Sequence, residues 1–196
     1  MSNPRIDLPD PDVARAALAD APPEVEEHFD LIRAGLRHIP WLTDDAVDWD
    51  RGDKNRALTL VPELFDLWWL EEYYVIKCGS VDAATKELLA LAVATRLGCQ
   101  SCVPYHAGAA RYEGAEDDLV ASMQRFDQRP EDIPDSLRRV LEVGLNSVYC
   151  PGEVTDDDIE SVRQLGYTDA EIVELVVCAH VSFKNAAFNQ VLNLGQ

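Results

Sequence analysis

The chain has 196 residues, of which 47% are hydrophobic and 27% are charged. These values are ordinary for one globular domain, or one domain with an appendage, and they argue against disorder along the whole chain. Lys and Arg number 17 against 36 Asp and Glu, which gives a formal net charge of −19. Because so acidic a surface repels phosphate groups and anionic lipids, we expect neither a nucleic-acid partner nor a membrane partner.

Targeting signals and disulfide frameworks are not apparent. The longest uninterrupted apolar run is Leu88 to Ala94, far short of the roughly 20 residues that cross a bilayer. The first residues include prolines and acidic side chains where a secretory signal needs basic residues and then an apolar stretch. An odd number of cysteines, five, does not suggest a structural disulfide framework. We therefore expect a soluble cytoplasmic protein.

The first part of the chain, residues 1–56, is predicted to be an N-terminal helical appendage and linker. Pro11 opens a short acidic and alanine-rich segment, and residues 24–38 have apolar side chains at helical spacing. Residues 40–57 are polar and rich in turn-forming residues, which indicates a linker or surface loop. Residues 57–196 then form the main body.

The main body is predicted to be helical throughout. A helix starts at Pro62 and ends before Gly79, and its face of Leu64, Trp68 and Val75 is typical of a core or subunit interface. Residues 83–97 are apolar nearly all round, so we expect a central helix that ends at Gly98.

Further helices follow with short connections. We expect them near residues 102–114, 116–125, 135–149 and 156–165, the last of these capped by Thr155. Thr168 and Glu171 form a capping box for a final long helix. No segment shows sustained strand alternation. The predicted fold class is all-α, a bundle of about eight helices.

Four residues could carry chemistry. Cys99 and Cys102 are three positions apart, after a helix-ending glycine and at the start of the next helix, where the positive end of the helix dipole favours thiolate. His106 lies one turn after Cys102 on the same face, placed to share a proton with that sulfur. Glu87, on an apolar helix, is suited to accept a proton near neutral pH.

The reach of Glu87 is not fixed by the sequence. Glu87 lies roughly 15 Å from the end of its helix, whereas His106 lies only about 6 Å along the returning helix. A contact between the two therefore requires a crossing angle between the helices or a bridging water molecule.

The spacing E-x11-C-x2-C-x3-H resembles the catalytic signature of the alkylhydroperoxidase D (AhpD-like) branch of the carboxymuconolactone decarboxylase superfamily. All four positions match, and the resemblance extends loosely from about Pro62 to Leu194. It implies that Cys102 attacks a hydroperoxide, that Cys99 resolves the sulfenic acid as a disulfide, and that Glu87 and His106 form the proton relay.

The resemblance also implies an AhpD-like helical bundle that uses no cofactor, neither a bound metal nor a flavin. It implies a homo-oligomer, a trimer or hexamer, and a thiol-dependent peroxidase or disulfide oxidoreductase that acts on a hydroperoxide or other small molecule. A lipoylated or other dithiol protein is the reductant that it implies. One position departs from the pattern, because Ser101 stands between the cysteines where the prototype has a His that assists the relay.

Other interpretations remain open. Cys99, Cys102 and His106 supply three zinc ligands where a structural site needs four, and no second such pair exists. The chain could also be a non-enzymatic redox-responsive helical oligomer, or a carboxymuconolactone decarboxylase-type lyase with Glu87 and His106 as base and acid. A thioredoxin-like fold is disfavoured because no βαβ pattern surrounds the pair. The remaining histidines are interpreted as surface or core-edge residues and the remaining cysteines as packing residues: His28, His38, His180, Cys78, Cys150 and Cys178.

Overall fold

The computed structural model describes residues 4–19 and 52–195, and these ranges contain nine α-helices, two short 3-10 helices and no strand. The all-α class is therefore confirmed, with one helix more than the eight or so expected. The helices are α1 (Pro11–Ala19), α4 (Asp53–Leu58), α5 (Pro62–Lys77), α6 (Ala83–Leu97), α7 (Cys102–Tyr112), α8 (Asp117–Met123), η1 (Pro130–Asp132), α9 (Asp135–Tyr149), η2 (Pro151–Glu153), α10 (Asp156–Gln164) and α11 (Asp169–Leu192).

Two compact units make up the chain. One consists of Met1–Tyr74 with Asn189–Gln196, and the other of Val75–Phe188. The boundary predicted after residue 56 stays a prediction, because most of residues 1–56 lies outside the described part of the chain. None of the described helices is long and apolar enough to span a membrane.

The first unit joins the two ends of the chain. The backbone N–H of Arg5 donates to the carbonyl of Leu192 at 2.9 Å, and the Arg56 guanidinium donates to the carbonyl of Pro9 at 2.8 Å. Lys54 lies over the ring of Trp69, with its Nζ 4.6 Å from the ring centroid. These contacts hold the first residues, α4, α5 and the end of α11 together.

One expectation about this unit is wrong, and another concerns residues that the structure does not describe. Residues 53–57 were predicted as part of a linker but belong to α4, where Asn55, Ala57 and Leu58 are buried. This short polar helix is stabilised by tertiary burial, which its local sequence does not show. The predicted helix over residues 24–38, with His28 and His38, lies outside the described residues.

Part of the α5 face that was predicted to be core or a subunit interface is exposed in the single chain. Phe65 is fully buried, whereas Leu64 and Leu67 are 52% and 63% exposed. Helical spacing alone marked Leu64 as apolar on one face, but α5 is apolar over so much of its circumference that the pattern could not select the side that is buried.

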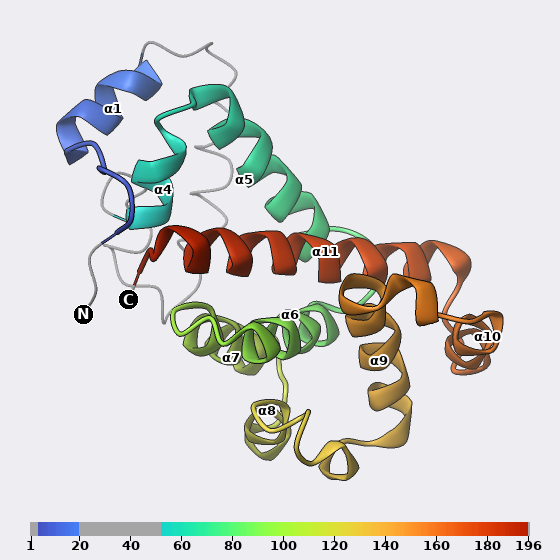
Figure 1. The fold of residues 1–196 in the computed structure, drawn as a ribbon. Coiled ribbons are helices and arrows are strands. Elements are labelled where there is room, and N and C mark those ends of the chain that lie inside the picture. The colour runs from blue at the N-terminus through green and yellow to red at the C-terminus, as the bar shows by residue number, and fades with distance from the viewer. Residues whose placement is uncertain (1–3, 20–51, 196) are drawn as a thin grey trace. The chain divides into compact units, whose positions relative to one another are not determined.

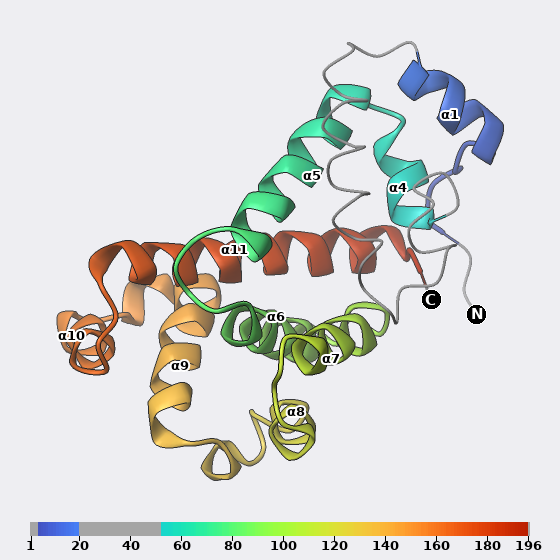
Figure 2. The same ribbon diagram turned by 180° about the vertical axis from the view of Figure 1, so that it is seen from behind.

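The second unit is built around α6. All residues from Thr85 to Ala94 are buried, because α7, α8 and α9 pack against this helix and Lys86 and Cys178 connect it to α11. Figures 1 and 2 show α6 and α7 side by side from both directions. The central position predicted for this apolar helix is confirmed.

The ends of α6 and α7 place the cysteine pair. The Asp82 carboxylate accepts a hydrogen bond from the backbone N–H of Thr85 at 2.8 Å and caps the start of α6. Gly98 ends α6 in the left-handed conformation at φ +70°, as the sequence predicted. Ser101 is the N-cap of α7, so Cys102 is the first residue of that helix.

The C-terminal helices begin where the capping signals indicate. Thr155 and Asp158 form a capping box at the start of α10. At the start of α11, the backbone N–H of Thr168 donates to the Glu171 carboxylate at 2.8 Å. Helix α9 spans Asp135–Tyr149, the range expected from the sequence. Local polar signals therefore fix these boundaries.

Candidate active site

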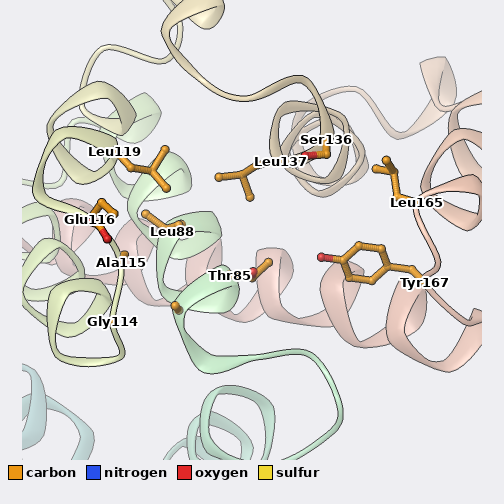
Figure 3. A pocket seen from close by; sticks show the side chains of 11 residues that line it. Thr85, Leu88, Gly114, Ala115, Glu116, Leu119, Ser136, Leu137, Leu165 and Tyr167 are labelled. Carbon is orange, nitrogen blue, oxygen red and sulfur yellow. The ribbon is translucent and has the colours of Figure 1, made fainter.

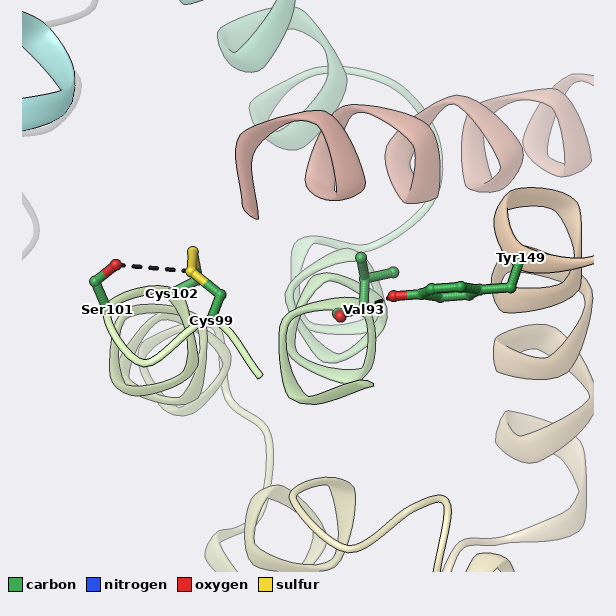
Figure 4. The surroundings of a disulfide bond; sticks show 5 residues. All are labelled: Val93, Cys99, Ser101, Cys102 and Tyr149. Carbon is green, nitrogen blue, oxygen red and sulfur yellow. Dashed lines mark hydrogen bonds between the residues drawn. A yellow bond between two sulfur atoms is a disulfide. The ribbon is translucent and has the colours of Figure 1, made fainter. Parts of the chain in front are cut away.

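Cys99 and Cys102 are joined by a disulfide, with their Cα atoms 5.3 Å apart. The pair forms a small buried cluster with Ala94 of α6 and Ala186 of α11. Figure 4 shows the disulfide at the turn between α6 and α7. The two cysteines singled out by spacing therefore share one covalent bond in the structure.

The two sulfur-bearing residues differ in exposure. Cys99 is 1% exposed and Cys102 is 8% exposed. Cys102 also begins α7, where the helix dipole is positive, while the Cys99 sulfur lies 3.6 Å from the Ser101 hydroxyl oxygen. Cys102 is therefore the more exposed residue of the pair and the one at the positive end of the helix dipole.

Glu87 and His106 are in direct contact. An Oε2 atom of Glu87 lies 2.8 Å from Nδ1 of His106, and the two residues are 1% and 8% exposed. The helices therefore approach closely enough for these side chains to meet without a bridging water, which answers the question of reach left open by the sequence. The Tyr105 ring is edge-on to the His106 ring, with 5.1 Å between the centroids.

This contact defines what the imidazole can do. With Nδ1–H donating to the carboxylate, Nε2 is the nitrogen left to accept or give a proton. His106 follows Cys102 by one helical turn on α7. A carboxylate-oriented imidazole beside a cysteine is the arrangement that general-base activation of a thiol requires.

A buried charge beside Glu87, and the partly buried carboxylate that pairs with it, were missed by the sequence analysis. Lys86 is 1% exposed and forms an ion pair with Glu174 of α11, and its ammonium also donates to the carbonyl of Cys78. The signal that could have found Lys86 is a lysine directly before Glu87 in an otherwise apolar segment. Its partner could not have been found, because Glu174 lies on a helix distant in sequence.

Burial raises the pKa of Cys178 to about 12, and the negative charge of Glu87 adds to this effect. Its thiol donates to the carbonyl of Lys86 at 3.7 Å. The packing role predicted for Cys178 is thus confirmed. The same prediction is wrong for Cys150, which is exposed, and Cys78 is half-buried.

The other polar candidates do not join the site. The His180 ring contacts the carbonyl of Ser147 at 3.1 Å on an exposed part of α11, as expected for a surface histidine. Within the described ranges, no group of three or more His, Cys, Asp or Glu side chains is arranged to hold a metal ion.

A separate open pocket of about 490 Å³ lies along the first half of α6. Leu88, Leu119 and Leu137 give it an apolar lining, and Thr85 and Tyr167 contribute hydroxyl groups, as Figure 3 shows. None of the four motif residues lines this pocket. The pocket is therefore not part of the candidate site.

Residues 62–128 match the model of the Carboxymuconolactone decarboxylase family. This segment contains the cysteine pair, Glu87 and His106. No curated protein matches the sequence at a significant level.

Several solved structures share the fold. One, the alkylhydroperoxidase AhpD core of an uncharacterized peroxidase-related protein from Ralstonia eutropha JMP134, has a TM-score of 0.74 at 16% identity over 99% of this chain and 92% of that one. An uncharacterized peroxidase-related protein from Silicibacter sp. TM1040 has a TM-score of 0.73 at 16% identity, over 99% and 94% of the two chains. The debrominase Bmp8 in complex with 2,3,4-tribromopyrrole has a TM-score of 0.66 at 12% identity, over 88% and 84%.

The family model matches residues 62–128, and the AhpD-like neighbours share the fold of the chain, so both agree with the resemblance to the AhpD-like branch of the carboxymuconolactone decarboxylase superfamily. The resemblance deduced from the motif is therefore confirmed. At these identities the structural likeness shows a shared fold alone. Because the neighbours include both peroxidase-related proteins and a debrominase, the reaction has to be argued from the site.

Proposed function

We propose that the chain is a thiol-dependent peroxidase, or disulfide oxidoreductase, in which Cys99 and Cys102 cycle between dithiol and disulfide. The observation that carries this proposal is the joined cysteine pair at the start of α7, one turn from a buried imidazole in contact with a carboxylate. The printed names of the neighbours, peroxidase-related and AhpD core, support it.

In the first step the Cys102 thiolate attacks the terminal oxygen of a hydroperoxide. The S–O bond forms as the O–O bond breaks, so Cys102 becomes a sulfenic acid and the substrate leaves as an alcohol. His106 takes the thiol proton at Nε2 and returns it to the departing oxygen. Glu87 holds the ring so that this nitrogen is available and stabilises the imidazolium that forms.

In the second step Cys99 resolves the sulfenic acid. Its sulfur attacks the sulfur of Cys102, the S–S bond forms, and the hydroxyl group leaves as water after gaining a proton. The peroxide has then gained two electrons, both supplied by the cysteine pair. A reductant with two thiols must return them by thiol–disulfide exchange, and a lipoylated protein is our proposed donor. Such a donor suits a cytoplasmic location.

Cys102 is assigned the attacking role for three reasons. It is the more exposed of the two residues, it begins the helix, and it lies one turn from His106. Cys99 is nearly inaccessible, and its sulfur contacts the Ser101 hydroxyl, a group that does not titrate near neutral pH.

A homo-oligomer, a trimer or hexamer, is also part of the proposal. Two leucines on α5, Leu64 and Leu67, are more than half exposed in the single chain and support this proposal. Burying such apolar side chains against another copy of the chain would be favourable. Light scattering after size-exclusion chromatography tests it, and a monomer at micromolar concentration would contradict it.

Peroxide consumption with a dithiol reductant tests the activity. We expect many equivalents to be consumed by the unaltered protein and none beyond background by Cys102→Ser. Cys99→Ser should turn over poorly and accumulate a sulfenic acid that dimedone traps. Cys150→Ser is the matched control, because Cys150 is an exposed thiol outside the pair, and it should behave like the unaltered protein.

The same assay distinguishes the alternatives. A redox-responsive oligomer would oxidise once and stop, even with dithiol in excess. A lyase that uses Glu87 and His106 on a carbon acid would keep its activity after both thiols are lost. Normal peroxide turnover by Cys102→Ser would eliminate the proposed function.

A further inference from the structure

The buried residues Lys86 and Glu87 and the partly buried Glu174 bring three formal charges together in the second unit. Lys86 and Glu87 are each 1% exposed although they are adjacent on α6. Lys86 pairs with Glu174, and Glu87 contacts His106. Burying charge is costly unless it is compensated, so the arrangement of partners decides which group carries the unbalanced charge.

The Glu174 carboxylate is fixed from several sides. Its Oε2 accepts hydrogen bonds from the backbone N–H groups of Ser80 at 3.0 Å and Val81 at 3.3 Å. Gly79, at φ +99°, lies so close that a Cβ atom there would overlap the carboxylate. Glycine at this position therefore allows the Glu174 carboxylate to lie close to the backbone of the turn before α6.

The pairing leaves a simple charge balance. Lys86 and Glu174 neutralise each other, so the negative charge of Glu87 remains for His106. Among the described residues, the titratable groups that face this pair include Cys178 on α11, which interacts electrostatically with Glu87, and Tyr105 on α7, whose ring is edge-on to His106. Cys178 responds to the charges of both Glu87 and Lys86, which places the two charges in one electrostatic environment.

We propose that Lys86 and Glu174 are positioning residues that set the proton affinity of the Glu87–His106 pair by cancelling each other's charge. This inference depends on the proposed function in one respect, which is that Glu87 and His106 form the proton relay. If Glu174 loses its charge, the Lys86 ammonium is left uncompensated and disfavours a second cation at His106. If Lys86 loses its charge, the Glu174 carboxylate is left uncompensated and favours that cation. The two changes must therefore act in opposite directions.

Nuclear magnetic resonance of the imidazole rings tests this without any need for turnover. The full chain has four histidines, and His106→Gln identifies the signal of His106. In Glu174→Gln, the pH midpoint of that signal should fall by roughly half a pH unit or more. In Lys86→Met, it should rise by a similar amount.

The double variant Lys86→Met with Glu174→Gln keeps the proposal testable if a single variant unfolds. It removes both charges, so its midpoint should return close to that of the unaltered protein. Asp135→Asn is the matched control, because it removes a negative charge from a solvent-exposed ion pair with Arg138, and it should leave the midpoint unchanged.

The outcomes separate cleanly. Opposite shifts that cancel in the double variant support the proposal. Shifts in one direction, or no shift in any variant that folds, overturn it and leave the ion pair a purely structural anchor. If the midpoints shift as expected but the protein consumes no peroxide, the electrostatic role holds and the proposed function fails.

Discussion

Glu87 and His106 are 19 positions apart and lie on different helices, yet a carboxylate oxygen of one is 2.8 Å from Nδ1 of the other. Both side chains are buried, so the contact is shielded from water. The electrostatic interaction between the carboxylate and the ring is therefore stronger than it would be in water. This contact joins two of the four residues matched by spacing, and His106 follows Cys102 of the cysteine pair by one helical turn on α7.

The charge of Glu87 can be removed while its shape is kept. In Glu87→Gln, the amide oxygen can still accept from Nδ1–H, but it no longer stabilises an imidazolium. We expect kcat/KM for a hydroperoxide to fall about 100-fold with the fold unchanged. Glu171→Gln is the control, since Glu171 sits in the first turn of its own helix, where Gln also completes a capping box. Equal rates for both variants would exclude a relay role for Glu87.

The three cysteines outside the disulfide should react very differently. Because the pKa of Cys178 is raised to about 12 by burial, only roughly one molecule in ten thousand carries its thiolate at pH 8. We expect iodoacetamide to label the exposed Cys150 readily and to label Cys178 only after unfolding. Peptide mass spectrometry after timed labelling reads this order, and early labelling of Cys178 would show that its surroundings open in the native protein.

Acid should weaken the fold through Glu174. Burial on its own raises the pKa of this carboxyl, but hydrogen bonds from Lys86 and from the backbone of Ser80 and Val81 outweigh it and hold the pKa below its ordinary value. A carboxyl whose pKa is lower in the folded state stabilises that state above its unfolded pKa, near 4.3, and this stability is lost as the pH falls through the folded pKa.

Glu174→Gln should therefore cost roughly 2 to 4 kcal/mol of unfolding free energy at pH 7, since it leaves Lys86 buried without its partner. The cost should shrink as the pH falls through the lowered pKa of the folded state, where the carboxyl of the unaltered protein gains its proton. Urea unfolding at several pH values measures both quantities. A cost that did not change with pH would mean that Glu174 acts by packing and not by charge.

Gly98 fixes the turn that presents the cysteines. Its φ of +70° is unfavourable for any residue with a Cβ atom. We expect Gly98→Ala to lower the unfolding free energy by about 1 kcal/mol and to slow closure of the disulfide in the reduced protein. Tyr149→Phe provides a comparison: it removes only the hydrogen bond from the ring hydroxyl to the carbonyl of Val93, visible in Figure 4, and should leave disulfide closure unchanged. Equal closure rates in Gly98→Ala and the unaltered protein would contradict a role for the turn.

Local signals were enough to predict much of the second unit. Helix ends at Gly98, Thr155 and Thr168 are fixed by neighbouring residues, and the apolar circumference of α6 predicts its central place. The spacing of the motif identified the cysteine pair because its members are close in sequence. The short helix α4 was missed because its polar residues are stabilised by burial against distant parts of the chain.

For the same reason, the sequence could not predict contacts between residues on different helices. Whether Glu87 reaches His106 depends on how α6 and α7 approach each other, which no local pattern encodes. The pairing of Lys86 with Glu174 depends on how α11 packs beside α6. A single sequence shows that a lysine stands in an apolar helix, but it does not show which carboxylate compensates the charge.

The most direct test of the central claim is peptide mass spectrometry of the fully reduced protein before and after one equivalent of a hydroperoxide. The tryptic peptide from Leu97 to Arg111 contains both Cys99 and Cys102. The proposed chemistry predicts that this peptide loses two hydrogen atoms as the internal disulfide forms, while the peptides with Cys78, Cys150 and Cys178 stay reduced. If the peroxide left both thiols of the pair reduced, or oxidised Cys150 first, the cysteine pair would not be the reacting group.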